Sequence, residues 1–195
     1  MDIGLKANRS KIGSLLAYLS FRMSGLELRK LLKIVYLIDE KAVKERSFPI
    51  TWLNYYAWAK GPVATGVYEI KNGAFSEYVN CTKNLSDKWT VSPVKKAEFP
   101  ILQGMKAYSN YEKSIIDSVI EQFGDKTSDE LTYVTHERNT LWYNVVKENN
   151  IDFTNNTKSN YPIDLNNLND DEHKEIFEEA FDTVQIQAAI NSNNV

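Results

Sequence analysis

Hydrophobic residues recur at helical spacing along most of the chain. The first run covers residues 8–22 and has one apolar face, formed by Ile12, Leu15, Leu16 and Leu19. A second helix is predicted to begin at a capping box, Ser24 to Glu27, and to run to about Arg46. Its apolar residues extend beyond one stripe, so we expect it to be packed on two sides at the centre of the fold. Its solvated side is expected to carry Lys30, Lys33 and Lys41.

A strand rich in aromatic residues is predicted from Ile50 to Ala59, where the side chains alternate between two faces. Lys60-Gly61-Pro62 is expected to end it, because glycine permits unusual backbone angles and proline is favoured at the first position of a helix. The short amphipathic helix that follows is predicted to end at Asn72-Gly73, a typical helix-stop pair.

The next stretch, residues 75–99, is interpreted as a β-rich excursion. Strands are predicted at 77–82 and 88–94, joined by a loop at 84–87. Pro93 and Pro100 favour an edge position for the second strand, because proline cannot donate to a ladder.

Helical spacing returns in the second half of the chain. A helix is predicted over residues 110–123 with Gly124 as its C-cap, and Thr127 and Glu130 are spaced as a capping box that opens another. Leu141, Trp142, Val145 and Val146 indicate a last helix of the main body. An Asn-rich stretch from 149 to 169 is interpreted as a long loop.

The C-terminal segment is predicted to be a helix from Asp170 to Ala189. Its acidic start suits the helix dipole, and Ile190 to Val195 are expected to fray. The predicted fold is therefore α+β and mainly α-helical: a compact helical body with a small antiparallel β-sheet, made of the aromatic strand plus the hairpin. We expect a domain at 1–148 with a β-rich insertion at about 75–100, and a 149–195 segment that packs on this body or on a partner.

Composition and charge narrow the class of protein. The chain has 195 residues, 43% of them hydrophobic, and a net charge of −3, which gives no global basic field for nucleic acid. The basic residues of the second helix are interpreted as a solvated face: Lys30, Lys33, Lys41, Lys44 and Arg46. A single cysteine, Cys81, excludes an intramolecular disulfide and fits a reducing compartment. Neither a signal peptide nor a membrane span is visible, so we expect a cytoplasmic protein without membrane contact.

No catalytic constellation stands out. His136 and His173 are in no metal-binding pattern, and Lys60-Gly61-Pro62 lacks the spacing of a phosphate loop, so we expect no metal, no cofactor and no enzymatic activity. His136 lies at a predicted helix end, where we expect it to satisfy terminal carbonyl groups. The aromatic residues between Trp52 and Trp58 are interpreted as core rather than as a platform for nucleic-acid bases.

Three ordered blocks of the sequence resemble a known family. Residues 30–39, Lys-Leu-Leu-Lys-Ile-Val-Tyr-Leu-Ile-Asp, are similar to the K-L-x-K-L-L-Y-L-x-D helix of the Panacea domain, the family of SocA-like antitoxins and phage-associated proteins. Phe48-Pro49-Ile50 with the stretch from Tyr56 to Val63 and Val67-Tyr68 resembles its P-[IL]…A-x-x-x-G-P-V…V-Y block. Residues 116–124, 128–137 and Trp142 resemble its closing segment. The insertion at 80–100 and the tail after Asn149 have no counterpart in this pattern.

The resemblance implies an antitoxin that neutralises a cognate toxin protein by binding it directly. The SocA branch implies in addition a proteolytic adaptor that delivers its toxin to a ClpXP-type protease. Partner-binding residues are then expected among the family blocks and the C-terminal helix: Tyr36, Trp58, Lys60, Gly61, Pro62, Tyr68, His136, Phe177 and Phe181.

Two other classes of protein remain open at this point. One is a nucleic-acid-binding transcriptional regulator, or a phage-associated regulatory protein, that would use the face of Lys30, Lys33, Lys41 and Lys44. The other is an enzyme such as a hydrolase, which would need a pocket that joins His136 to a carboxylate.

Overall fold

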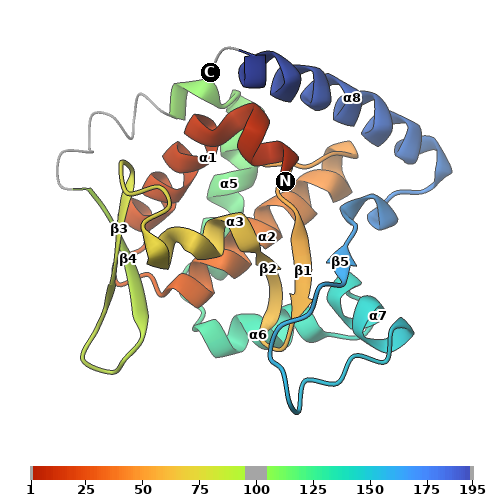
Figure 1. Cartoon of the computed structure of the whole chain (residues 1–195). Coiled ribbons are helices and arrows are strands. Elements are labelled where there is room, and N and C mark those ends of the chain that lie inside the picture. The colour runs from red at the N-terminus through yellow and green to blue at the C-terminus, as the bar shows by residue number, and fades with distance from the viewer. Residues whose placement is uncertain (1, 95–104, 194–195) are drawn as a thin grey trace.

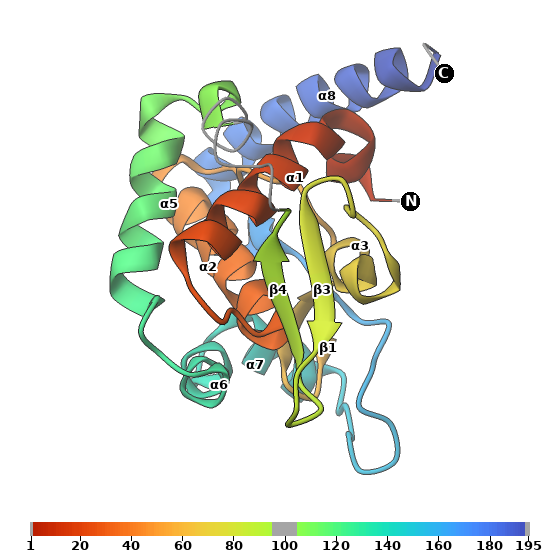
Figure 2. The same cartoon turned by 90° about the vertical axis from the view of Figure 1, so that its left-hand side faces the viewer.

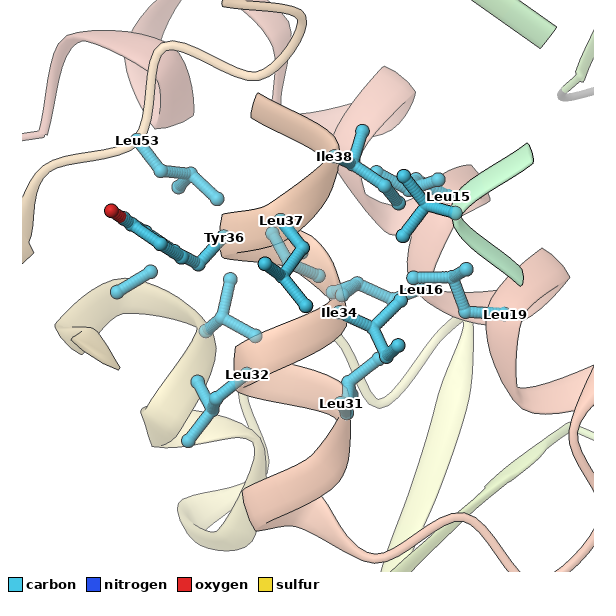
Figure 3. Close-up of a cluster of buried hydrophobic side chains, with 14 of the residues drawn as sticks. Leu15, Leu16, Leu19, Leu31, Leu32, Ile34, Tyr36, Leu37, Ile38 and Leu53 are labelled. Atoms are coloured by element: carbon cyan, nitrogen blue, oxygen red, sulfur yellow. The ribbon is translucent and has the colours of Figure 1, made fainter. Parts of the chain in front are cut away.

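The helix α2 (Leu28–Arg46) lies at the centre of the fold, as its two-sided apolar pattern predicts (Figure 1). The computed structural model describes residues 2–94 and 105–193. One side of α2 packs its isoleucines against the leucines of α1 (Ile3–Arg22), and Tyr36 points the other way, toward Leu53 (Figure 3). Leu31, Ile34, Val35 and Ile38 are each 0% exposed. The prediction of a central, doubly covered helix is confirmed.

The remaining helices surround α2. They are α3 (Thr65–Tyr68), α5 (Asn110–Phe123), α6 (Ser128–His136), α7 (Leu141–Glu148), α8 (Asp171–Asn193) and three short 3₁₀ turns at Glu69–Asn72, Met105–Ala107 and Leu165–Leu168. The capping box of Thr127 and Glu130 is confirmed, with both reciprocal hydrogen bonds present. Gly73 has φ 93° and ends the turn before it, as predicted.

The strands form two separate antiparallel sheets within the described residues. One has the order β2-β1-β5, with β1 (Tyr55–Trp58), β2 (Gly61–Ala64) and β5 (Pro162–Ile163). The other pairs β3 (Val79–Lys83) with β4 (Trp89–Pro93) and lies against α1 (Figure 2). The mainly helical α+β class is confirmed. The aromatic strand and the hairpin do not share a sheet, however, because a strand from the tail occupies the free edge of β1.

Pro62 does not begin a helix, which corrects the prediction. The strands β1 and β2 form a tight hairpin in which Trp58 pairs with Gly61 and Ala57 pairs with Pro62. Proline is tolerated because β2 is an edge strand, where its missing N–H group costs no ladder bond. The predicted strand is also shorter than expected, since Trp52 has φ 57° and breaks the alternation.

Two helix starts differ from the prediction. The helix α1 begins at Ile3 and kinks at Asn8, where φ is −142° and ψ is 36°, so the predicted run of residues 8–22 is its second segment. The additional first segment is capped by Asp2, which also accepts a hydrogen bond from the backbone N–H of Asn54 at 2.9 Å. The predicted capping box at Ser24 does not form. Glu27 is instead the N-cap of α2, and its carboxylate is held by Lys88 at 2.6 Å and by Ser128 at 2.7 Å.

The Asn-rich stretch is tied to the body through β1. The backbone N–H groups of Ala57 and Ala59 donate to the carbonyls of Tyr161 (3.0 Å) and Thr157 (2.9 Å). The helix α8 then lies along α1 (Figures 1 and 2). It continues to Asn193, so the predicted fraying is wrong for residues 190–193, where Asn191 donates to the carbonyl of Ala7 at 2.8 Å. The last two residues of that prediction lie outside the described residues. The predicted β-rich excursion beyond Val94, with Pro100, lies outside the described residues.

Candidate functional site

The second family block, which includes the stretch from Tyr56 to Val63 and Val67-Tyr68, forms one wall of an open cleft. Trp58 at the end of β1 and Tyr68 at the end of α3 meet edge to face, with ring centroids 4.9 Å apart. The cleft has a volume of about 390 Å³, and Leu28 and Leu32 of α2 contribute apolar lining. Lys60 and Trp89 complete it from the β1–β2 turn and from β4. Such an apolar, aromatic cleft with a few charged groups is typical of a binding site.

A lysine from the tail lies inside this cleft. The Nζ atom of Lys158 is 4.9 Å from the ring centroid of Trp58 and 5.2 Å from that of Tyr68. This is the geometry of a cation–π contact, in which the negative face of an aromatic ring attracts an ammonium group. Trp58 is also fixed from the same loop, because its Nε1 donates to the carbonyl of Ser159 at 3.1 Å. The tail therefore contributes directly to the cleft that the family block builds.

The charges around the cleft are mostly paired. Glu27 pairs with Lys88 at 2.6 Å, and Arg29 pairs with Asp129 at 2.9 Å. The hydrogen bond from Lys88 lowers the pKa of the Glu27 carboxyl, so this carboxyl is ionised at neutral pH. Lys60 is exposed at the mouth of the cleft.

Gly61 is required by the close packing behind the cleft. Its φ of 116° lies in a region that favours glycine, and an added Cβ would lie 3.0 Å from both Lys33 Nζ and Thr135 Oγ1. Lys33 was predicted on a solvated face but is only 2% exposed. Its ammonium group turns inward because it donates to the carbonyl oxygen of Lys60. Burial lowers the pKa of Lys33 to about 7, and Arg29 adds to this effect.

His136 lies beside this buried lysine. Its ring stacks on the indole of Trp142, and the Trp142 Nε1 donates to the carbonyl of Trp58 at 2.8 Å. Burial, followed by the charges of Lys33 and Lys60, lowers the pKa of His136 to about 4, so its ring is neutral at pH 7. Its Nε2 atom is buried and has no hydrogen-bond partner among the described residues.

The expected capping role of His136 is not observed. The hydroxyl of Thr140 instead donates to the carbonyl oxygens of Thr135 (3.0 Å) and Glu137 (2.9 Å) at the end of α6. No hydrogen bond or ion pair joins the His136 ring to a carboxylate within the described residues, so the pair that the hydrolase hypothesis requires is not observed there.

Tyr36 and Asp39 of the first family block serve the core. Tyr36 is 1% exposed and packs edge to face on Tyr55, so it offers no surface to a partner in this structure. Asp39 is 0% exposed and accepts hydrogen bonds from the backbone N–H groups of Ile50 and Thr51, both at 2.9 Å, and from the Tyr55 hydroxyl at 2.8 Å. This block therefore ties α2 to the chain that enters β1.

Phe177 and Phe181 do not line the cleft. They line a different pocket. Both rings pack on Trp52, with centroid distances of 5.0 and 5.6 Å. Together with Leu53 and Ile163 they line a pocket of about 470 Å³ between α8 and the three-stranded sheet. These two residues attach α8 to its own body.

The structure thus gathers six of the nine predicted partner-binding residues in one region: Trp58, Lys60, Gly61, Pro62, Tyr68 and His136. Gly61 and Pro62 are buried there and shape the cleft from behind. The residues that the sequence interpretation missed are Trp89 and Lys158. Their sequence context gave no signal, because Trp89 belongs to the hairpin and Lys158 to the Asn-rich loop.

Two kinds of site are not found in the described part of the chain. Residues 2–94 and 105–193 contain no group of three His, Cys, Asp or Glu side chains that could hold a metal ion. None of the helices described is long and apolar enough to cross a membrane.

Comparison with known families identifies the class of protein. Residues 31–143 match the family described as antitoxin SocA-like, Panacea domain. The match covers more than half of the chain, so the chain belongs to this family. It ends inside α7 and leaves β5, Lys158 and α8 outside. No curated protein and no solved structure matches the chain.

Proposed function

We propose that this chain is an antitoxin that neutralises a cognate toxin protein by binding it directly. Membership of the SocA-like family carries this proposal. It is supported by the cleft of Trp58, Lys60 and Tyr68, which offers aromatic rings and an exposed cation to a protein partner. Aromatic residues of this kind provide much of the binding energy in protein interfaces.

Neutralisation works by occlusion in this proposal. A specific interface covers about 800 Å² of each partner, enough to hide the working surface of a small toxin. The antitoxin needs no catalytic group, cofactor or metal for this purpose. The complex forms in the cytoplasm, where the toxin acts, and does not involve a membrane.

The same complex can serve as a degradation intermediate. The SocA-like branch implies an adaptor that presents its toxin to a ClpXP-type protease. An adaptor must hold the toxin without unfolding with it, and the tightly packed core around α2 suits that requirement.

The lysines of α2 favour a protein partner over nucleic acid. Lys33 is buried, and Lys30 donates to the carbonyl of Gly124. Lys41 pairs with Glu45 at 2.9 Å and Lys44 with Glu40 at 3.4 Å. A face whose cations are already neutralised releases few counterions from DNA, which is the main source of affinity for the phosphate backbone.

Co-expression with the protein encoded beside its gene tests the proposal. We expect that protein to arrest growth alone, and we expect this chain to restore growth and to co-purify with it. Persistent arrest in cells that contain the folded chain would refute neutralisation. The adaptor role is tested separately by the toxin half-life, which should increase in cells that lack the protease.

A further inference from the structure

The helix α8 has a stripe of three exposed isoleucines, mixed with acidic residues, in addition to the face that packs on the body. Ile176, Ile186 and Ile190 are 43%, 63% and 50% exposed. At about 100° per residue, these three side chains and Thr183 fall within an arc of roughly 80° on the helix. The same arc holds the exposed Glu172 and Glu179, so this face is mixed apolar and acidic. The spacing of Ile176, Thr183 and Ile190 is that of one position in successive heptads, which is the pattern by which a helix docks on an apolar partner.

The opposite face of α8 already packs on the body, so the exposed isoleucines are not the residues that attach this helix to the core. Phe177 and Phe181 contact Trp52, and Ala188 is only 3% exposed. Asn191 donates to the carbonyl oxygen of Ala7 at 2.8 Å and fixes the C-terminal end. The helix is held in place by one side and presents Ile186 and Ile190 on the other, whereas Ile176 lies at the edge, where it lines a pocket with Val43 of α2.

The charge of α8 identifies the chemistry of the partner. Seven of the 26 acidic residues lie between Asp170 and Asp182, with a single lysine among them, so this segment carries a net charge of −6. The rest of the chain has 19 acidic and 22 basic residues, a net charge of +3. Glu172, Glu175 and Glu179 are exposed. At about 100° per residue, Glu172 and Glu179 lie among the isoleucines and Glu175 lies at the edge of their arc. They form no ion pair with a described residue.

We infer that the outward face of α8 is a second docking surface for the toxin, and that the toxin covers it with an apolar groove or helix rimmed by lysine and arginine. This inference rests on the proposed function and names the chemistry of the contact. A basic rim neutralises the acidic half of α8 and accelerates encounter, whereas a second copy of this chain would bring another −6 segment to the same interface. The surface lies outside the matched residues 31–143, so it is a feature of this member that the family match does not include.

The test uses the full chain, the purified protein encoded beside its gene as the probe, and calorimetric titration. Ile186→Asp is expected to weaken binding at least tenfold, because it places a charge in the stripe. Gln185→Asp is the matched control: it adds the same charge at the neighbouring exposed position, about 100° around the helix, and should stay within twofold of wild type. Equal helical content and melting temperature would show that both variants fold.

A charge reversal tests the basic rim. The double variant Glu175→Lys and Glu179→Lys should weaken binding and reduce its salt dependence, and Glu121→Lys on α5 should do neither. Binding by Ile186→Asp at wild-type strength would overturn this inference alone. A dimer of the free chain that Ile186→Asp dissociates, with toxin binding unchanged, would also overturn it, since a second copy would then occupy the face. Absence of any binding by the wild-type chain would overturn the proposed function as well.

Discussion

The imidazole of His136 lies flat on the indole of Trp142, with ring centroids 3.4 Å apart and planes 4° from parallel. Trp142 in turn donates to the carbonyl of Trp58, the aromatic wall of the cleft. The stack therefore connects the end of α6 to the cleft through α7 and β1. Because the ring is neutral and its Nε2 has no hydrogen-bond partner in the described part of the chain, we expect this connection to depend on pH.

The first prediction concerns stability at acidic pH. The pKa of His136 is about 4 in the folded protein and about 6.5 in an unfolded chain, so the unfolded state binds more protons between these values. Stability should therefore be complete above pH 6.5 and fall as the pH drops toward 4. The pKa shift limits the loss of unfolding free energy to about 3 kcal/mol. Because the ring is partly exposed, we expect a loss of roughly 1–2 kcal/mol.

Urea unfolding of wild type and His136→Phe between pH 4 and 7 measures this effect. Phenylalanine keeps the stack on Trp142 and cannot titrate, so its stability should depend less on pH in this window. Equal pH dependence in the two proteins would show that other groups cause it.

A second prediction concerns the backbone at the cleft. Gly61→Ala should destabilise the protein by about 2–3 kcal/mol, because it combines a left-handed backbone with close contacts to Lys33 and Thr135. Gly73→Ala is the control. It has a similar φ of 93°, but its Cβ would meet nothing within 4 Å, so about 1 kcal/mol is expected. Equal losses measured by chemical denaturation would mean that the packing around Gly61 can relax.

The buried carboxylate of Asp39 gives a third prediction. Tyr55→Phe removes one hydrogen bond to Asp39 and should cost about 1–3 kcal/mol of unfolding free energy. Asp39→Ala should cost more, since it leaves the N–H groups of Ile50 and Thr51 without their acceptor. If Asp39→Ala and Tyr55→Phe had equal stability, the hydrogen bonds from Ile50 and Thr51 to Asp39 would not contribute as expected.

The cleft itself provides the fourth prediction. Tyr68→Ala removes the ring that contacts Trp58 and Lys158, so toxin affinity should fall about tenfold or more. Tyr133→Ala is a suitable control because Tyr133 is 76% exposed on α6. Both affinities can be measured by titration calorimetry after the melting temperatures are compared. Equal affinity of the Tyr68→Ala variant and wild type would exclude the cleft from the interface.

The sequence predicts well those features that depend on local periodicity. The apolar pattern of α2 identifies the central helix, since a helix whose apolar residues extend beyond one stripe must be covered on two sides. The capping box at Thr127 is likewise a local signal. The family blocks also locate the cleft, because Trp58, Lys60 and Tyr68 are close in the chain and in space.

Features that depend on distant partners are not predictable in this way. The sequence places Lys33 among the basic residues of a solvated helix face. Its side chain turns inward only because the folded chain brings the carbonyl of Lys60 within hydrogen-bonding distance. Pro62 is a strand residue because β2 pairs with one edge of β1, and the local sequence does not reveal this pairing. For α8, which has apolar residues on two faces, the sequence does not determine whether Phe177 or Ile186 faces the body.

The central claim is that this chain inactivates a toxin by binding it. The most direct measurement is the activity of the purified protein encoded beside its gene, titrated with this chain in a defined assay without protease. We predict that activity falls in proportion to the added chain and disappears near a one-to-one ratio. Toxin activity that stays unchanged with the folded chain in excess would contradict direct neutralisation.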